Sequence, residues 1–371
     1  MSNSMERSQI LALFAEAPAL RSILSTLELA SLPPRVAVHF AVLNTRRDID
    51  AVLFNLRGVS LAYHGRSADH VSFMLERFGP TDESELPIPL FVQRSKTKGI
   101  VLLMSCCTGT EWRERVGHLV RRLYPFAYQP FLGQNALLQV VERLQAALPR
   151  NQKLRVVKVS QTRPLLQRLS RRRTESGLRW TDVPFADAFN EAAQQTIHFR
   201  KISLQACIET DREITATGLD ISVGADGTVS TTSRAAWVHS YGVELVLELA
   251  GKTAQFAEAH AREERAKPSV PLVAAFSSEY PIRKEDIKKV AAELRKLPDA
   301  SVSVTQGNPY LRASISDQLD GSSYEVVLTS ETRLLIIPQL RATQGSITRL
   351  CRFIYDAIGE AEFTEQDLGT A

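Results

Sequence analysis

Hydrophobic and polar residues follow strand and helix periods in the same order near the two ends of this chain. In the first half, short apolar or alternating stretches typical of strands are separated by stretches with an apolar residue every three or four positions, typical of helices. This pattern predicts a strand, a helix, a returning strand, a hairpin and a helix, at Arg35–Asn44, Thr45–Leu56, Val59–Tyr63, Leu90–Arg94 with Gly99–Cys106, and Thr110–Leu123.

The last hundred residues repeat this order of elements. Their pattern predicts a strand, a helix, a returning strand, a hairpin and a closing helix, at Val270–Phe276, Ile282–Leu297, Ser301–Thr305, Tyr324–Leu328 with Arg333–Pro338, and Thr343–Ile358. The segments RRDIDAV and RKEDIKKV also follow the first strand at equivalent places. We therefore expect an α+β fold with two related β-α-β-hairpin-α units, whose sheets are mainly antiparallel and flank a basic central segment.

Further elements are predicted within the first half and in the sequence between these two units. The pattern predicts further helices at Ser67–Phe78, Gln134–Leu148 and Phe185–Thr196, a strand at Arg200–Ile208, and a long helix at Ala235–Arg265. A GADG sequence at 224–227 between two alternating stretches is a strong signal for a hairpin turn. We divide the chain into an N-terminal helical segment (1–34), a first α+β unit (35–149), a basic segment with a middle α+β region (150–266), and a second α+β unit (267–371).

Composition narrows the class of protein more than it identifies the function. The chain has 371 residues, of which 44% are hydrophobic and 23% charged, and these values are ordinary for a globular protein with two or three domains. We find no apolar stretch of the length that crosses a bilayer and expect no membrane partner. Four scattered cysteines do not make a disulfide framework, so we expect a cytoplasmic protein, or a nuclear one in a eukaryote.

Charge is distributed very unevenly along the chain. Residues 150–179 contain ten lysines and arginines but a single acid, Glu175, which gives this window a net charge of +9. Because the whole chain has a net charge of +4, the remaining residues sum to −5. A local excess of this density attracts phosphate groups.

The basic window also has an internal pattern. Residues 153–159 alternate like a strand, and Thr162 followed by Pro164 is typical of a helix start. In that helix Leu165, Leu166 and Leu169 would share one face and dock on the body of the protein. Arginines would occupy another face, at positions 168, 171 and 172, and could point toward a polyanion or pair with acids elsewhere in the chain.

No reaction chemistry is evident in the sequence. Phosphate-binding glycine loops, CxxC pairs and nucleophile elbows are missing, and we expect no metal and no cofactor. The exceptions to test are two histidines and an acid in YHGRSADH (His64, Asp69 and His70), which could form a metal or general-base site. An aromatic stretch at 123–132 could stack nucleic-acid bases or plug a core edge.

These observations favour a non-enzymatic protein that binds nucleic acid, DNA or RNA, through a central basic surface. The residues expected to contact phosphates are Arg155, Lys158, Arg163, Arg168, Arg171, Arg172 and Arg173. Two alternatives stay open. The chain could be a scaffold subunit that assembles with protein partners through sheet edges and terminal helices, or a hydrolase with an unfamiliar site around His64, Asp69 and His70.

Overall fold

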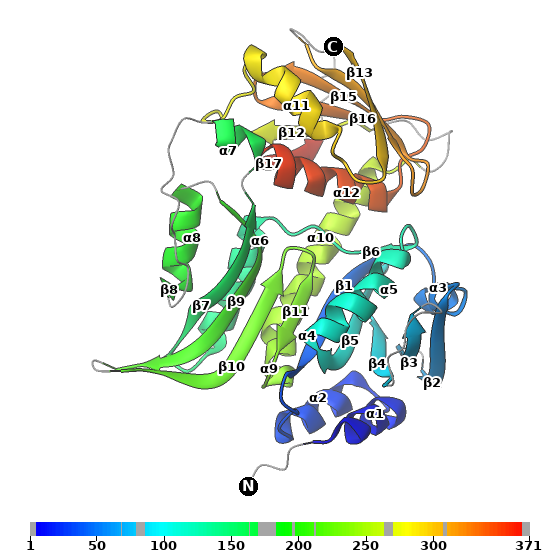
Figure 1. Ribbon diagram of the computed structural model, residues 1–371, viewed down its shortest axis with the longest axis vertical. Coiled ribbons are helices and arrows are strands. Elements are labelled where there is room, and N and C mark those ends of the chain that lie inside the picture. Colours follow the sequence, from blue (N-terminus) through cyan, green and yellow to red (C-terminus); the bar gives the residue numbers. More distant parts are fainter. Residues whose placement is uncertain are drawn as a thin grey trace. The chain divides into compact units, whose positions relative to one another are not determined.

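Helices and antiparallel sheets make up this α+β protein, as the computed structural model shows (Figure 1). The structure describes residues 5–67, 69–78, 86–162, 164–169, 183–194, 197–210, 213–262, 270–306 and 310–365. Two compact units are present, one containing residues 1–160, 179–191 and 199–252, the other residues 161–178, 192–198 and 253–371. The division into four segments expected from the sequence stays a prediction.

The larger sheet begins with a series of five strands and a helix, which we call the first series. Its strands are β1 (Val36–Thr45), β2 (Val59–Arg66), β3 (His70–Phe78), β4 (Ile88–Arg94) and β5 (Ile100–Thr108), and helix α3 (Ile49–Phe54) lies between β1 and β2. In space the strands follow the order β2-β3-β4-β5-β1, and each neighbouring pair is antiparallel. A nearly continuous helix follows β5, in the segments α4 (Gly109–Glu111), η1 (Trp112–Val116) and α5 (Gly117–Arg122).

The sheet continues beyond β1 with strands from the middle of the chain. They follow β1 in the order β11 (Thr228–Thr231), β10 (Ile214–Gly224), β9 (His198–Glu209), β7 (Gln152–Thr162) and β8 (Val183–Pro184), and a short β6 (Ala127–Tyr128) also pairs with β1. The predicted GADG hairpin is confirmed, because β10 ends at Gly224 and β11 starts at Thr228 with a positive φ at Gly227. The remaining helices of this region are α1 (Arg7–Glu16), α2 (Leu20–Leu29), α6 (Gln134–Ala147), α8 (Phe185–Gln194), α9 (Ala235–Val238), η2 (His239–Val243) and α10 (Glu244–His260).

Both faces of strands β1, β3, β4 and β5 are largely buried, whereas β2 at the edge is half-exposed. On one face α3, η1 and α5 pack over a core that includes Leu43, Phe73 and Leu103, and Figure 1 shows α5 crossing the strands there. On the other face α1 packs against β2, β3 and β4, and the ring of Phe40 on β1 contacts that of His239. A strand that is covered on both faces buries the side chains of both, which explains why these strands are nearly continuous hydrophobic runs.

The smaller sheet contains a second series with the same order of elements. Its strands are β12 (Leu272–Phe276), β13 (Ala300–Gln306), β14 (Arg312–Asp317), β15 (Ser323–Ser330) and β16 (Arg333–Pro338), and η3 (Lys284–Asp286) with α11 (Ile287–Leu294) lies between β12 and β13. The spatial order is β13-β14-β15-β16-β12, all antiparallel, and β17 (Ala361–Glu365) adds to the other side of β12. Helix α12 (Gln344–Phe353) and η4 (Ile354–Ile358) follow β16.

Only one face of this second sheet is fully buried among the described residues. Helices α11 and α12 cover Ala274, Ile315 and Ile336, together with Leu165 and Leu166 from the short helix α7 (Leu165–Leu169). The two leucines therefore dock α7 as the sequence predicts. Side chains of the opposite face are half-exposed or exposed, as the alternating burial along β12, β14 and β16 shows.

Two sequence predictions of secondary structure need correction, and one strand of the second series was missed. Ser67–Phe78 is not a helix, because His70–Phe78 forms strand β3. This strand is covered on both faces, and a short apolar run of that kind cannot be distinguished from a buried helix by periodicity. Helix α3 begins at Ile49 rather than Thr45, since Asp48 is its N-cap and accepts a hydrogen bond from the Asp50 amide. Strand β14 was not predicted at all.

No helix among the described residues is both long enough and apolar enough to cross a membrane. The described cysteines are all buried free thiols. Burial raises the pKa of Cys107 to about 12, and it also raises the pKa values of Cys106 and Cys351, so these thiols pack as small core residues.

Candidate functional site

The seven basic residues proposed from the sequence lie in several parts of the chain. Arg155 and Lys158 are on β7, and Arg168 is on α7. The other four lie outside the described residues, and these are Arg163, Arg171, Arg172 and Arg173. Nothing in the structure therefore bears on the arginine-rich stretch after α7.

Arg155 is engaged within the sheet. Its guanidinium lies 2.6 Å from one carboxylate oxygen of Glu209 on β9, and the Lys153 amine lies 2.7 Å from the other. Hydrogen bonds from Lys153 and Arg155 lower the pKa of Glu209, so this carboxylate is charged at neutral pH. Only 15% of the Arg155 side chain is exposed. Its main contribution is to hold β7 to β9, with little charge left for an external phosphate.

Arg168 keeps more of its charge accessible. Its guanidinium lies 3.4 Å from Glu293 on α11, but Lys296 lies closer to the same carboxylate, at 2.8 Å. One carboxylate shared by two cations leaves an excess of positive charge at this place. The Arg168 side chain is also 48% exposed, so it remains available to an anion.

Lys158 belongs to a group of three exposed cations, which we call the basic cluster. The other members are Lys201 on β9 and Arg113 on η1. Partial burial lowers the pKa of Lys201, and the positive charges of Lys158 and Arg113 lower it further while Asp226 opposes them. No carboxylate of the described residues forms an ion pair with any of the three. Lys158 on β7 and Arg113 on η1 thus repel Lys201 on β9.

Asp226, the acid whose charge acts on Lys201, already has partners. Asp226 accepts hydrogen bonds from the Thr228 hydroxyl at 2.6 Å and from the Gln129 amide at 3.1 Å. These contacts fix its carboxylate in the β10–β11 turn. Asp226 therefore offsets part of the positive charge without closing an ion pair with Lys201.

A band of polar side chains extends from the basic cluster across the sheet. Lys201, Ser203 and Gln205 alternate along β9 and so point to one face. On neighbouring β10 the Ser222 hydroxyl lies 2.8 Å from that of Ser203, and Asp220 accepts a hydrogen bond of 2.8 Å from Gln205. This half-buried polar face has hydroxyl and amide groups beside the cations.

More positive charge lies on helix α5, next to η1. Arg121 and Arg122 supply this charge and are exposed, as is the neighbouring His118. At the end of β1, the guanidinium of Arg47 lies 4.3 Å from the centre of the Phe126 ring, which is partly exposed. Tyr128, by contrast, is buried in β6. Within the aromatic stretch 123–132, Phe126 is thus accessible for stacking, whereas Tyr128 packs in the core.

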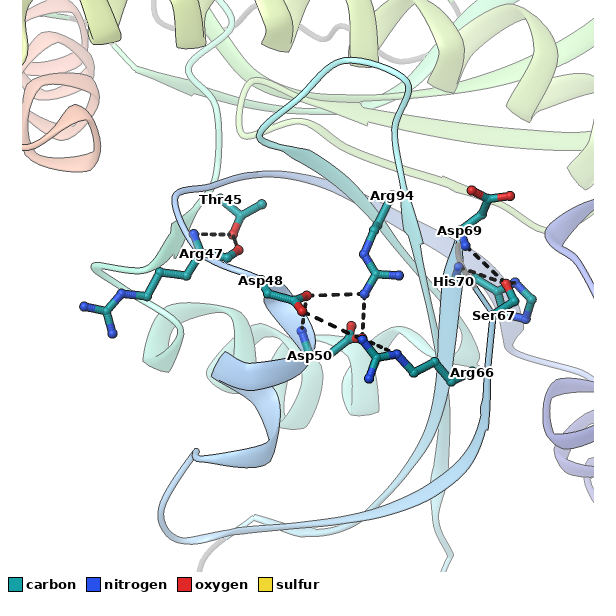
Figure 2. Close-up of polar contacts among 9 residues, drawn as sticks. All are labelled: Thr45, Arg47, Asp48, Asp50, Arg66, Ser67, Asp69, His70 and Arg94. Atoms are coloured by element: carbon teal, nitrogen blue, oxygen red, sulfur yellow. Dashed lines mark hydrogen bonds and ion pairs between the residues drawn. The ribbon is translucent and has the colours of Figure 1, made fainter.

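The histidine and aspartate trio does not converge. His64 is exposed on β2, while the His70 ring is buried against Phe91 and lies 2.6 Å from the Ser67 hydroxyl. Burial lowers the pKa of His70. Figure 2 shows the Asp69 carboxylate directed away from that ring. This arrangement offers no shared point for a metal or a general base.

The polar network in Figure 2 is instead an ion-pair cluster at the start of α3. Asp50 has only 4% of its side chain exposed and lies 2.5 Å from Arg94 and 3.2 Å from Arg66. The more exposed Asp48 lies 3.2 Å from Arg94 and 3.9 Å from Arg66. Two acids balance two cations, so the network ties α3 to strands β2 and β4 and has no net charge to offer a ligand.

A cavity of about 1060 Å³ lies near this network, between α2, the α9–α10 segment and the β4–β5 hairpin. Four cations line it, namely Arg21, Arg94, Lys96 and Arg143. Its three glutamates nearly balance them, and Glu28 and Glu248 already bind the Ala236 amide and Lys252. The cavity therefore shows no preference for an anion.

No group of three or more histidines, cysteines or acids among the described residues is placed to hold a metal ion. The basic cluster remains the strongest candidate site in this part of the chain. Sequence reasoning found Lys158 but missed Lys201 and Arg113, which lie outside the basic window. No protein-family model matches this chain, and no curated protein matches it either.

Proposed function

We propose that this protein binds nucleic acid, DNA or RNA, without catalysing a reaction, through a basic surface centred on Lys158, Lys201 and Arg113. The observation that supports this proposal best is that Lys158 and Arg113 lie close enough to Lys201 for their charges to act on it, while no carboxylate of the described residues forms an ion pair with any of the three. A phosphate backbone would relieve this repulsion and release its own counterions, which favours association.

The surroundings of the basic cluster fit a backbone ligand better than a compact anion. Exposed cations continue along α5, and the polar face of β9 and β10 adds hydroxyl and amide groups that can bind phosphate or sugar oxygens. Contacts with the phosphate backbone carry no sequence information, so we propose affinity that depends on salt and little on sequence.

The basic segment expected from the sequence stays part of this proposal. Arg163, Arg171, Arg172 and Arg173 would bind phosphates as well, and Arg168 would contribute its exposed guanidinium. Arg155 would act indirectly, since its ion pair with Glu209 positions β7. Nucleic acid is found in the cytoplasm and in the nucleus, so either location suits this function.

We also propose that the first and second series are two related units that flank the basic central segment. Their identical order of strands and helices supports a common origin, although few residues are shared. In an experimental structure β1–β5 with α3 should superpose on β12–β16 with α11. Different strand pairing in either series would contradict the relationship.

The function can be tested with fluorescence anisotropy on labelled single-stranded DNA, duplex DNA and RNA over a salt series. The double variant Lys158→Gln with Lys201→Gln should weaken binding about tenfold or more, and lower the slope of log affinity against log salt by about 2. The matched control is Lys252→Gln with Lys289→Gln, which removes the same charge from ion-paired positions on helices α10 and α11. Its binding should stay close to that of the wild type.

A second variant tests the residues outside the described part of the chain. Changing Arg171, Arg172 and Arg173 together to alanine should weaken binding further and with the same salt dependence. Wild-type protein that binds none of the three nucleic acids at low salt would contradict the proposal. So would a lysine double variant with unchanged affinity and slope.

A further inference from the structure

Strand β13 is an edge of the smaller sheet. It pairs with β14 on one side, and no strand of the described residues pairs with its other side. In such an edge, every second residue directs its backbone N–H and C=O groups away from the sheet. These groups can form a further ladder of hydrogen bonds with another extended chain.

The sequence of β13 does nothing to prevent such pairing. Its seven residues, ASVSVTQ, include no charge and no proline. The valines, Val302 and Val304, are half-buried against the core of the second unit, whereas Ser301, Ser303 and Thr305 are exposed. Uncharged strands rich in β-branched residues are those that associate most readily.

The other described sheet edges are protected in ways that β13 is not. Strand β2 has two register shifts and contains His64 and Arg66, strand β8 is only two residues long, and strand β17 has exposed glutamates at positions 362 and 365. Short length, irregular register and charge are the usual devices that keep an edge unpaired. Strand β13 has a single register shift, near its end between Val304 and Gln306.

We infer that β13 pairs with β13 of a second copy of this chain, in antiparallel orientation about a twofold axis. The strand is complementary to itself in this arrangement. With the axis at Val302, Ala300 faces Val304 on the core face and Ser301 faces Ser303 on the exposed face. With the axis at Ser303, Val302 faces Val304 and Ser301 faces Thr305. The half-exposed Val302 and Val304 would lose solvent contact as the two sheets become one.

A second copy fits this edge better than a ligand on the neighbouring face. That face has a hollow of about 310 Å³ lined mainly by serines, with Arg312 and Glu325 already paired nearby. Such a surface offers little apolar area to bury. Backbone pairing along β13 therefore provides the larger gain, and it is independent of the nucleic-acid proposal.

The test is the molar mass of the full chain, measured by light scattering and sedimentation over a dilution series. Wild-type protein should have twice the mass of one chain at high concentration and dissociate on dilution. The double variant Ser301→Lys with Ser303→Lys places like charges opposite each other, and should raise the dimer dissociation constant at least about tenfold. The double variant with glutamate at both positions should do the same.

Mixing the two variants distinguishes pairing from misfolding. An equimolar mixture of the lysine and glutamate forms should recover the doubled mass, because opposite charges then face each other across the strands. The control places lysines at Ser314 and Ser316 on the same face of β14, inside the sheet, and should stay dimeric. Thermal unfolding should show that every variant is folded.

Three outcomes would overturn the inference. Wild-type protein with the mass of one chain at all concentrations would exclude the dimer, even if a synthetic peptide of residues 299–306 bound to it. Lysine variants that keep the doubled mass would show that the copies meet elsewhere. A mixture that stays monomeric while both variants are folded would show that position 301 or 303 does not face its counterpart.

Discussion

The first and second series have the same order of elements but very different surroundings. In the first, α3 and α5 cover one face of the strands, and α1 with neighbouring helices covers the other. In the second, α11 and α12 cover one face, and the other is half-exposed in the described residues. Their edges differ as well, since β2 has two register shifts and a charged end, whereas β13 is uncharged.

This difference shows that the order of strands does not decide what a sheet does. The same topology has strands largely covered on both faces in the first series, whereas among the described residues of the second series one face is half-exposed and one side of β13 has no strand partner. Function therefore has to be argued from the residues left at each surface. In this chain those residues are the basic cluster, which lies next to the first series, and the edge strand β13 of the second series.

The largest expected effect concerns the ion-pair network that holds β2 to α3. Replacing Asp50 by alanine removes a buried carboxylate between Arg66 and Arg94, and should lower the free energy of unfolding by about 3 to 5 kcal/mol. Asp48→Ala, at the more exposed N-cap, should cost only about 1 kcal/mol. Chemical denaturation measures both. Equal losses would mean that burial does not distinguish the two acids.

A second prediction uses pH to probe the covered face of the first series. His39 stacks on Trp112, and burial lowers its pKa from 6.5 to about 4, with the charge of Lys201 adding to the effect. The unfolded chain therefore binds a proton at this histidine below about pH 6.5, and the folded chain does so only near pH 4. Up to about 3 kcal/mol of stability should be lost as the pH falls through this window.

The variant His39→Phe isolates this contribution. It keeps a ring against Trp112 but cannot titrate, so its stability should fall less steeply than that of the wild type between pH 6.5 and pH 4. Glu111 and Glu209, whose pKa values are lowered by hydrogen bonds from their partners, are present in both proteins. Parallel stability curves for wild type and variant would contradict the assignment to His39.

The smallest effect compares one substitution in the two series. Val42 on β1 is fully buried, and Val42→Ala should destabilise the first unit by about 2 kcal/mol. Val273 on β12 points to the half-exposed face, so Val273→Ala should cost less than about 1 kcal/mol. Thermal unfolding of the two variants gives the difference. A loss at Val273 as large as that at Val42 would show that another element covers this face.

Sequence patterns predicted those parts of the fold where one period dominates. The amphipathic helices, the alternating strand β9 and the GADG turn are of this kind, and the structure contains all of them. Strand β3 was mistaken for a helix because its residues 71–75 are buried on both faces, which removes the alternation. Strand β14 was missed because RASISD is short and mostly small or polar.

The candidate site was predictable only in part. The excess of basic residues in the window 150–179 pointed to Lys158. The ion pair between Arg155 and Glu209 joins residues 54 positions apart, so no local sequence pattern predicts it. Lys201 and Arg113 are far from Lys158 in the sequence, and only the folded structure brings them close to it. The alternation of Lys201, Ser203 and Gln205 along β9 could have indicated a polar face, since three polar residues at every second position are unusual in a core strand.

Hydrogen exchange of the full chain, with and without a saturating oligonucleotide at low salt, tests the central claim most directly. The account predicts slower amide exchange on binding in β7, β9 and η1, which bear Lys158, Lys201 and Arg113, and unchanged exchange in β14, β15 and β16. Slower exchange confined to those three strands of the second series, or no change anywhere, would contradict it.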